Sequence, residues 1–130
     1  MEWDGSNRRQ FPRIAYPCLV KIMNAGKSTD IFLTHTENIG VGGLCVIVKH
    51  EIKMFSPVTI EIDLVEDPEH ITASGSVVWT VRRKAGVTVK PMFYDIGIKF
   101  DAIKDKDKAR LGAAINKFIE KGYKVLKPVY

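Results

Sequence analysis

The chain has 130 residues, of which 45% are hydrophobic and 27% charged, and its formal net charge is +5. This length is enough for one domain with a hydrophobic core and too short for two. No apolar run approaches the roughly 18 residues that a membrane span requires, and the N-terminal residues do not resemble a secretory signal. We therefore expect a cytoplasmic protein that does not insert into a membrane.

The positive charge is concentrated at the C-terminal end of the chain. Residues 104–130 contain eight lysines and arginines against three acidic residues, so they carry the whole net charge of +5. A basic helix face is usually a solvated surface, and contact with an acidic partner or a polyanion is the less common alternative. Nucleic acid is therefore not an expected partner.

Short segments of alternating apolar and polar residues follow one another up to residue 100, separated by Gly, Pro, Asp or Asn. This pattern is typical of antiparallel strands. The predicted strands span residues 14–22, 30–37, 44–48, 58–64 and 71–81, and a sixth contains residues 94–100. In the fifth strand, Val77, Trp79 and Val81 are predicted to share one face. Six short strands without intervening helices indicate a mainly β fold, either a small closed barrel or a sandwich.

The periodicity becomes helical after the sixth strand. Leu111, Ile115, Phe118 and Ile119 recur at helical spacing, with lysine and arginine on the opposite face. This spacing predicts an amphipathic helix over about residues 105–122. Its apolar stripe is expected to pack against the barrel. A contact between two copies of the chain is the alternative, so the sequence leaves a homodimer as a second possibility.

Three arginines, Arg8, Arg9 and Arg13, lie in a polar stretch before the first predicted strand. Guanidinium groups on a flexible arm suit bidentate contacts with phosphate oxygens or with the O6/N7 edge of guanine. From spacing alone, a solvated basic arm is an equal alternative. The predicted organisation is a flexible arm with the arginine motif (1–13), a barrel with its C-terminal helix (14–123) and a tail (124–130).

A glycine-rich segment, Asn38-Ile39-Gly40-Val41-Gly42-Gly43, connects the second and third predicted strands. Glycines allow backbone N–H groups to approach a ligand closely. The segment is also expected to be a strand connection with positive φ angles. It lacks the Gly-Lys-Ser/Thr ending of a phosphate loop, and the strand that follows it excludes a dinucleotide-binding turn, which continues as a helix.

No group of residues in the sequence has the spacing of a catalytic or metal site. The three histidines are isolated, and the serines lack a nucleophile-elbow context. Cys18 and Cys45 lie in apolar strands without Cys-x-x-Cys spacing, so we expect buried, reduced thiols. We predict a protein that is not an enzyme and that holds neither a metal nor a cofactor.

Four short motifs, in this order, resemble those of the PilZ family, small bacterial β-barrels that bind the second messenger cyclic di-GMP. The motifs are Arg9-x-x-x-Arg13, Asn38-x-Gly40-x-x-Gly43, Gly75-x-Val77-x-Trp79 and Tyr94-Asp95-Ile96-Gly97-Ile98-Lys99-Phe100. Each is weak alone, but the combination is specific and spans nearly the whole chain. The resemblance implies a six-stranded antiparallel PilZ-type β-barrel with a C-terminal α-helix.

The resemblance also implies roles for individual residues toward cyclic di-GMP. Arg9 and Arg13, with Arg8 as a further candidate, would contact phosphate oxygens and the guanine edge. Asn38 would hydrogen-bond a guanine, while Gly40 and Gly43 would shape the turn and leave room for the ligand. The family has serine at the position of Gly40, and a lost hydrogen bond to a charged group costs about 1.5–3 kcal/mol. Binding is therefore expected to be weakened, with loss of binding as the alternative.

The implied function is that of a receptor whose arm closes over the ligand and presents a new surface to an unidentified effector protein. Motility, biofilm formation or exopolysaccharide production would be the controlled output. The alternative is a PilZ-like adaptor that does not bind the nucleotide and acts only through protein contacts. Trp79 is expected in the core or at the barrel rim, in preference to stacking on a base.

Overall fold

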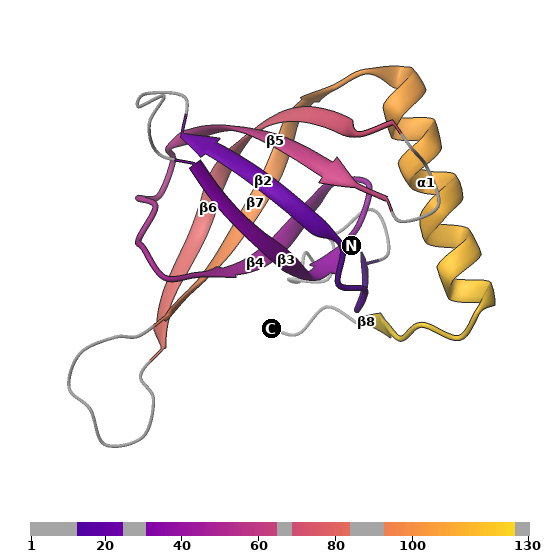
Figure 1. The fold of residues 1–130 in the computed structure, drawn as a ribbon, viewed down its shortest axis with the longest axis horizontal. Helices are drawn as coiled ribbons and strands as arrows, with labels where there is room; N and C mark the ends of the chain where they lie inside the picture. The colour runs from indigo at the N-terminus through magenta and orange to yellow at the C-terminus, as the bar shows by residue number, and fades with distance from the viewer. Residues whose placement is uncertain (1–12, 25–30, 65–68, 84–92, 127–130) are drawn as a thin grey trace, which may run out of the picture.

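The computed structural model describes residues 13–24, 31–64, 69–83 and 93–126. Arg8 and Arg9 lie outside these residues. The described part of the chain contains, in sequence order, the strands and the helix shown in Figure 1: β1 (Arg13–Ile14), β2 (Leu19–Asn24), β3 (Ile31–Ile39), β4 (Gly43–Val48), β5 (Pro57–Asp63), β6 (Ile71–Arg83), β7 (Phe93–Ile103), α1 (Asp105–Glu120) and β8 (Val125–Leu126).

Six of the strands form a closed antiparallel barrel. They are hydrogen-bonded in the order β2-β5-β6-β7-β4-β3, and the pairing of β2 with β3 closes the ring (Figure 1). Strands β1 and β8 continue the sheet beyond β3, because β1 pairs with β3 and β8 pairs with β1. The predicted mainly β fold with a six-stranded antiparallel barrel and a C-terminal helix is confirmed, and the sandwich is excluded.

The first predicted strand, residues 14–22, is wrong as a single element. Pro17 has no N–H to donate to a ladder, and the chain bends there into the separate strands β1 and β2. In the bend, Tyr16 N donates to Ile14 O at 3.0 Å and Cys18 N donates to Tyr16 O at 3.2 Å. The bend frees β1 to pair with β8, a strand that forms from residues assigned to the tail.

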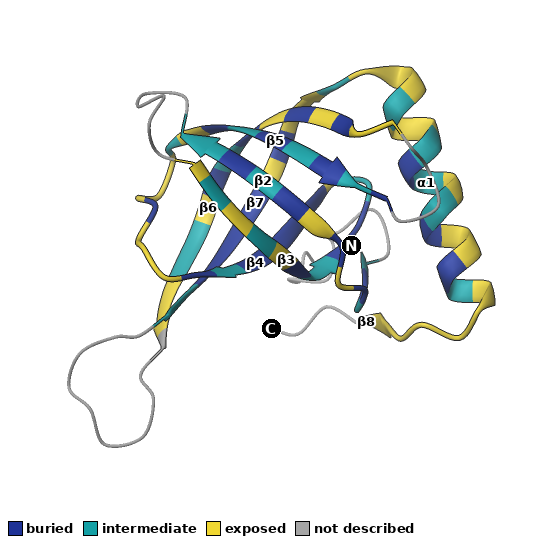
Figure 2. Ribbon diagram, in the orientation of Figure 1, coloured by how far each residue is buried: buried dark blue, intermediate teal, exposed yellow. Residues whose placement is uncertain are grey.

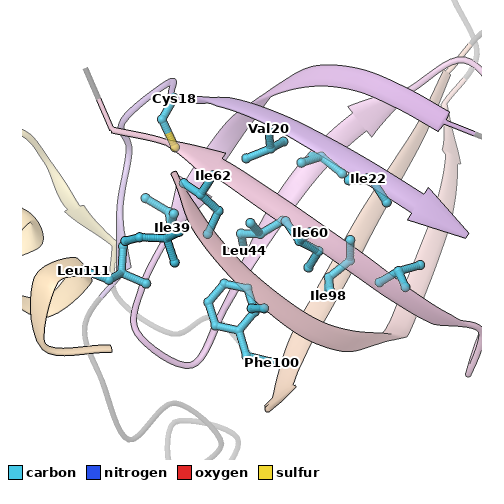
Figure 3. Close-up of a cluster of buried hydrophobic side chains, with 14 of the residues drawn as sticks. Cys18, Val20, Ile22, Ile39, Leu44, Ile60, Ile62, Ile98, Phe100 and Leu111 are labelled. Atoms are coloured by element: carbon cyan, nitrogen blue, oxygen red, sulfur yellow. The ribbon is translucent and has the colours of Figure 1, made fainter. Parts of the chain in front are cut away.

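The barrel interior is filled by alternate residues of the strands, as the period-two pattern predicted. Figure 2 shows buried positions alternating with partly buried ones along β2 and β5. Figure 3 shows the resulting core, in which Val20 and Ile22 from β2 lie near Ile60 and Ile62 from β5, all of them 0% exposed. Cys18 is part of this core and is also 0% exposed.

Strand β6 contains an irregularity that changes which residues face the core. Val77 is 0% exposed and pairs with Ile98, whereas Trp79 pairs with Gly97, so Val78 is an extra residue in the ladder. Such a bulge reverses the facing of the residues that follow it. The prediction that Val77, Trp79 and Val81 share a face is therefore wrong, and Val81 is 52% exposed.

Helix α1 lies beside the barrel (Figure 1) and contacts β1 and β6. Leu111, Ile115 and Phe118 are buried, and the ring of Phe118 stacks on Tyr16 with the ring centroids 3.9 Å apart. The expected docking of the helix within the chain is confirmed. The helix ends at Glu120 with Lys121 as its C-cap. Gly122 follows with a φ of +97°, and Tyr123 N donates to Phe118 O at 3.0 Å.

Within the described ranges, no helix combines the length and the apolar character needed to cross a membrane.

Candidate functional site

The outer surface of β3, β4, β7 and β6 carries a row of four laterally paired residues. Asn38 is opposite Cys45, Cys45 is opposite Gly97, and Gly97 is opposite Trp79. Directly opposite residues in neighbouring strands point to the same face of a sheet. Since Ile96 and Ile98 on either side of Gly97 are both 0% exposed in the core, the row points outward. We call these four residues the ligand-face row.

Arg13 lies at the β3 end of the ligand-face row. Its Nη1 atom donates a hydrogen bond to Asn38 Oδ1 at 3.3 Å, although the two residues are 25 positions apart in the sequence. The neighbouring backbone pair explains this contact, because Ile14 in β1 is opposite Ile39 in β3. The structure therefore brings together one arginine and the asparagine of the two motifs that the sequence identified separately.

Gly43 leaves the room that the arginine side chain occupies. A Cβ atom at this position would overlap the carbonyl oxygen of Ile98 and lie 3.1 Å from Nη2 of Arg13. Any side chain at residue 43 would therefore displace both the neighbouring strand and the guanidinium group. The motif glycine is needed here for close packing beside the strand.

The expectation of positive φ angles in the glycine-rich segment is wrong. Among the glycines in the described ranges, only Gly122 has a positive φ. The segment is a compact turn in which Gly40 N donates to Gly43 O at 2.9 Å and Phe100 N donates to Gly42 O at 3.0 Å. Gly40 is buried in this turn, next to the meeting point of Arg13 and Asn38.

Trp79 forms the β6 end of the ligand-face row. Its indole ring covers Gly97 so closely that a Cβ at residue 97 would overlap ring atoms Nε1 and Cε2. The ring is only partly buried, because it lies on the outside of the barrel. Of the two expected positions, the core is therefore wrong, and the rim stays a prediction. In the sequence, Gly97 could have indicated that another group lies over this strand, since a glycine inside a strand often marks close approach of another group.

Lys99 is a cation beside the site that sequence reasoning missed. It is directly opposite Gly43, and its side chain is exposed. Arg13 and Lys99 therefore lie on either side of Gly43. The sequence shows Lys99 only as an ordinary polar position of an alternating strand, and the register between β4 and β7 is needed to place it.

Cys45 forms part of the floor of the ligand-face row as a neutral thiol. It is 3% exposed, and its Sγ donates to Glu37 Oε2 at 3.2 Å. Burial raises the pKa of this thiol well above its ordinary value, and the hydrogen bond to the Glu37 carboxylate raises it further. Burial also raises the pKa of Cys18. As expected from the sequence, both cysteines are buried and neither forms a disulfide.

A pocket of about 440 Å³ is lined by Val41 of the glycine-rich segment and by residues of α1. It lies between Val41 and a helix face that includes Ala109, Gly112 and Ile115. The turn is therefore bounded by Arg13 on one side and by the helix on the other. In the described ranges, no group of three or more His, Cys, Asp or Glu side chains is placed to hold a metal ion.

Solved structures with the same fold include several larger proteins. The Bacillus subtilis inhibitor of motility MotI/DgrA aligns with a TM-score of 0.69 and 19% identity over 88% of this chain and 53% of its own. MrkH of K. pneumonia in its apo state aligns with a TM-score of 0.71 and 15% identity over 93% of this chain and 53% of its own. The chain thus spans about half the length of these two proteins.

The PilZ domain of YcgR from Escherichia coli, solved with c-di-GMP, matches over nearly its whole length. The alignment has a TM-score of 0.65 and 14% identity, and it covers 88% of this chain and 92% of that domain. No curated protein sequence matches the chain significantly. Residues 7–117 match the PilZ domain, a range that includes both motifs and the ligand-face row. The chain therefore belongs to the PilZ domain family.

Proposed function

We propose that this protein is a receptor for cyclic di-GMP that binds the dinucleotide on the ligand-face row and signals to a protein partner. Membership of the PilZ family and the likeness to the YcgR domain solved with c-di-GMP support this proposal. The observation that carries it is the convergence of Arg13, Asn38 and Gly43 at one end of the row.

The charged end of the site suits the phosphates of the ligand. Arginine has five N–H donors in a planar fork, so the hydrogen bond to Asn38 is compatible with bidentate contact to a phosphate. Asn38 also sets the plane of the guanidinium group before the ligand arrives, which lowers the ordering cost of binding. Lys99 would add a second, less directional positive charge across Gly43.

The rest of the ligand-face row suits a planar base. Cys45 is small and buried, and it forms a low floor between Arg13 at one end and the Trp79 indole, which lies over Gly97, at the other. Stacking of a base on an aromatic side chain contributes about 1–3 kcal/mol. Trp79 therefore joins Arg13, Asn38 and Lys99 as a proposed contact for the dinucleotide.

Arg8 and Arg9 lie five and four positions before Arg13 in the sequence, and we propose that they reach the ligand from the arm before β1. Ligand binding would order this arm over the barrel and change the surface seen by a partner. By analogy with MotI, described as an inhibitor of motility, motility control is the first proposed output. Biofilm control is proposed beside it, as an expectation from the family resemblance alone. The protein would act in the cytoplasm, without catalysing a reaction.

Gly40 supports a second candidate function, that of an adaptor that does not bind the nucleotide. The family motif has a serine here, and the glycine offers no hydroxyl to a ligand. The backbone N–H of Gly40 is used within the turn, where it donates to Gly43 O at 2.9 Å. Under this alternative, Arg13 and Asn38 would serve only to join β1 to β3.

Titration calorimetry with cyclic di-GMP separates the two functions. The wild type is expected to bind at micromolar concentration or tighter, and Arg13→Ala and Asn38→Ala are each expected to weaken binding by about tenfold or more. Lys53→Ala is the matched control, since it removes one exposed positive charge from the connection between β4 and β5. Absence of binding by the wild type, or equal losses in all three variants, would contradict the receptor function.

A gain-of-function variant gives a second test. Gly40→Ser restores the family hydroxyl, and it is expected to tighten binding by about one to two orders of magnitude, as for a hydrogen bond to a charged group. If the wild type does not bind and Gly40→Ser does, the adaptor function is the correct one for this chain.

A further inference from the structure

An exposed apolar surface lies on β2 and β3, two strands that contribute neither Trp79 nor Gly97 of the ligand-face row. Leu19, Ile31 and Leu33 are 42%, 48% and 69% exposed, respectively. Single exposed apolar residues are normal on a protein surface, but three large aliphatic side chains on two adjacent strands form a patch. Their exposure contributes nothing to the stability of the barrel.

Strand register makes this surface continuous. Leu33 is directly opposite Lys21, and Ile31 is directly opposite Met23, which is partly buried. Leu19 lies one diagonal step from Leu33, a spacing of about 7–8 Å that aliphatic side chains can bridge. We call Leu19, Lys21, Met23, Ile31 and Leu33 together the β2–β3 face.

The β2–β3 face and its border carry charges of both signs. Glu61 and Asp63 of β5 lie beside Lys21 and Leu19, respectively, and Lys21 Nζ is 3.6 Å from Glu61 Oε2. A surface with both signs can face its own copy without like-charge repulsion.

The closed ring also limits how a second molecule can join the barrel. Pairing of β2 with β3 leaves no free edge among the six barrel strands, so another chain cannot extend the ladder there. The remaining way for a second molecule to join is to pack against the outer face of the sheet, which is the usual way in which two sheets bury apolar residues. The surface offered for such packing is the β2–β3 face.

We propose that the protein forms a two-fold symmetric dimer through the β2–β3 face. A second copy of the chain is the occupant that fits best, since an isologous interface requires one patch that is both apolar and self-complementary in charge. Leu33, the most exposed of the aliphatic residues, would be the central contact. The β2–β3 face contains none of the four residues of the ligand-face row, and the dimer does not depend on the proposed nucleotide binding.

Sedimentation velocity over a range from low to high micromolar concentration tests this proposal. The wild type is expected to shift from monomer to dimer, and Leu33→Thr is expected to raise the dissociation constant by about tenfold or more. Threonine is a β-branched residue that is favoured in strands, so the fold is expected to be retained. Val81→Thr is the matched control, because Val81 is 52% exposed on β6, outside the β2–β3 face.

The charge arrangement provides a second variant. Lys21→Glu would place like charges against Glu61 and Asp63 across the interface, and it is expected to weaken the dimer at low salt more than at high salt.

A wild type that stays monomeric at high micromolar concentration would overturn the proposal, and a different protein would then be the candidate partner of the β2–β3 face. A dimer equally stable in Leu33→Thr and Val81→Thr would place the interface elsewhere. Leu33→Thr is expected to bind cyclic di-GMP with unchanged affinity, so a failure of the dimer proposal can be told apart from a failure of the receptor proposal.

Discussion

The indole ring of Trp79 in β6 covers Gly97 in β7, in the space that a Cβ atom of residue 97 would occupy. The two residues are directly opposite in the ladder, at the end of a row that begins at Asn38 and Arg13. An aromatic ring over a strand glycine is a rigid arrangement, because the ring fills the gap left by the missing side chain. Trp79 is thereby held as a fixed wall of the proposed dinucleotide site.

Gly97→Ala is expected to displace the indole and to weaken cyclic di-GMP binding. The added methyl group would overlap ring atoms rather than the end of a flexible side chain, so we expect a loss of about 1–3 kcal/mol in the free energy of unfolding. Tryptophan fluorescence in a Trp3→Phe background reports the indole of Trp79 alone, since the chain has two tryptophans. An unchanged emission spectrum together with unchanged affinity would contradict the proposed role.

Gly43→Ala and Gly112→Ala form a matched pair with opposite expected outcomes. At residue 43 the new Cβ would overlap the Ile98 carbonyl and crowd Arg13, so a destabilisation of about 1–3 kcal/mol and loss of ligand binding are expected. At residue 112, inside α1, it would lie 3.6 Å from Val41, an ordinary contact. Because alanine is the better helix former, Gly112→Ala is expected to stabilise by about 0.5–1 kcal/mol. Urea unfolding of both variants checks the contrast, and equal effects would refute it.

Phe55→Gly is expected to stabilise the protein. Phe55 has a φ of +68°, in the left-handed region that costs a residue with a Cβ about 1–2 kcal/mol. Its side chain is 76% exposed, so little burial is lost on its removal. After allowing for the greater freedom of glycine in the unfolded chain, the expected net gain is about 0.5–1 kcal/mol.

Met54→Gly is the control for this prediction, since Met54 is a neighbouring exposed residue without a positive φ. It is expected to leave stability unchanged or to lower it. Thermal unfolding of the two variants measures the difference. A lower midpoint for Phe55→Gly than for Met54→Gly would mean that the turn is not strained at residue 55.

The buried thiols predict a loss of stability at alkaline pH. Burial and the Glu37 carboxylate raise the pKa of Cys45 in the folded state, whereas in the unfolded chain the thiol ionises near its ordinary pKa of about 8.5. The contribution of the neutral Cys45 thiol to the free energy of unfolding is therefore fully present below about pH 8.5. As the pH rises above this value, the free energy of unfolding falls by up to about 1.4 kcal/mol per pH unit.

Urea unfolding of the wild type and Cys45→Ala between neutral and alkaline pH checks this dependence. Cys45→Ala is expected to lose stability less steeply above the ordinary thiol pKa, while the difference between the two proteins is constant near neutrality. Cys18 contributes in the same direction, because its pKa is also raised by burial. Parallel curves for the wild type and Cys45→Ala would show that the Cys45 thiol ionises equally in both states.

Local patterns in the sequence were sufficient to predict most of the elements and the core. Alternation along residues 58–64 and 94–100 predicted β5 and β7, and helical spacing from Leu111 to Phe118 predicted the buried face of α1. These predictions hold because side-chain facing in a regular element follows from its period alone. The motif residues Arg13, Asn38 and Gly43 were also recognisable, since their residue types and order suit an anionic ligand.

Only the tertiary structure decided how these parts meet. The extra residue Val78 turns Trp79 outward, and the pairing of β8 with β1 depends on residues more than 110 positions apart, Arg13 and Leu126. Register and bulges reflect the packing of strands that are distant in the chain, so no local period reveals them. For the same reason, the sequence showed Asn38 and Trp79 as separate residues, and the ladder placed them in one row with Cys45 and Gly97.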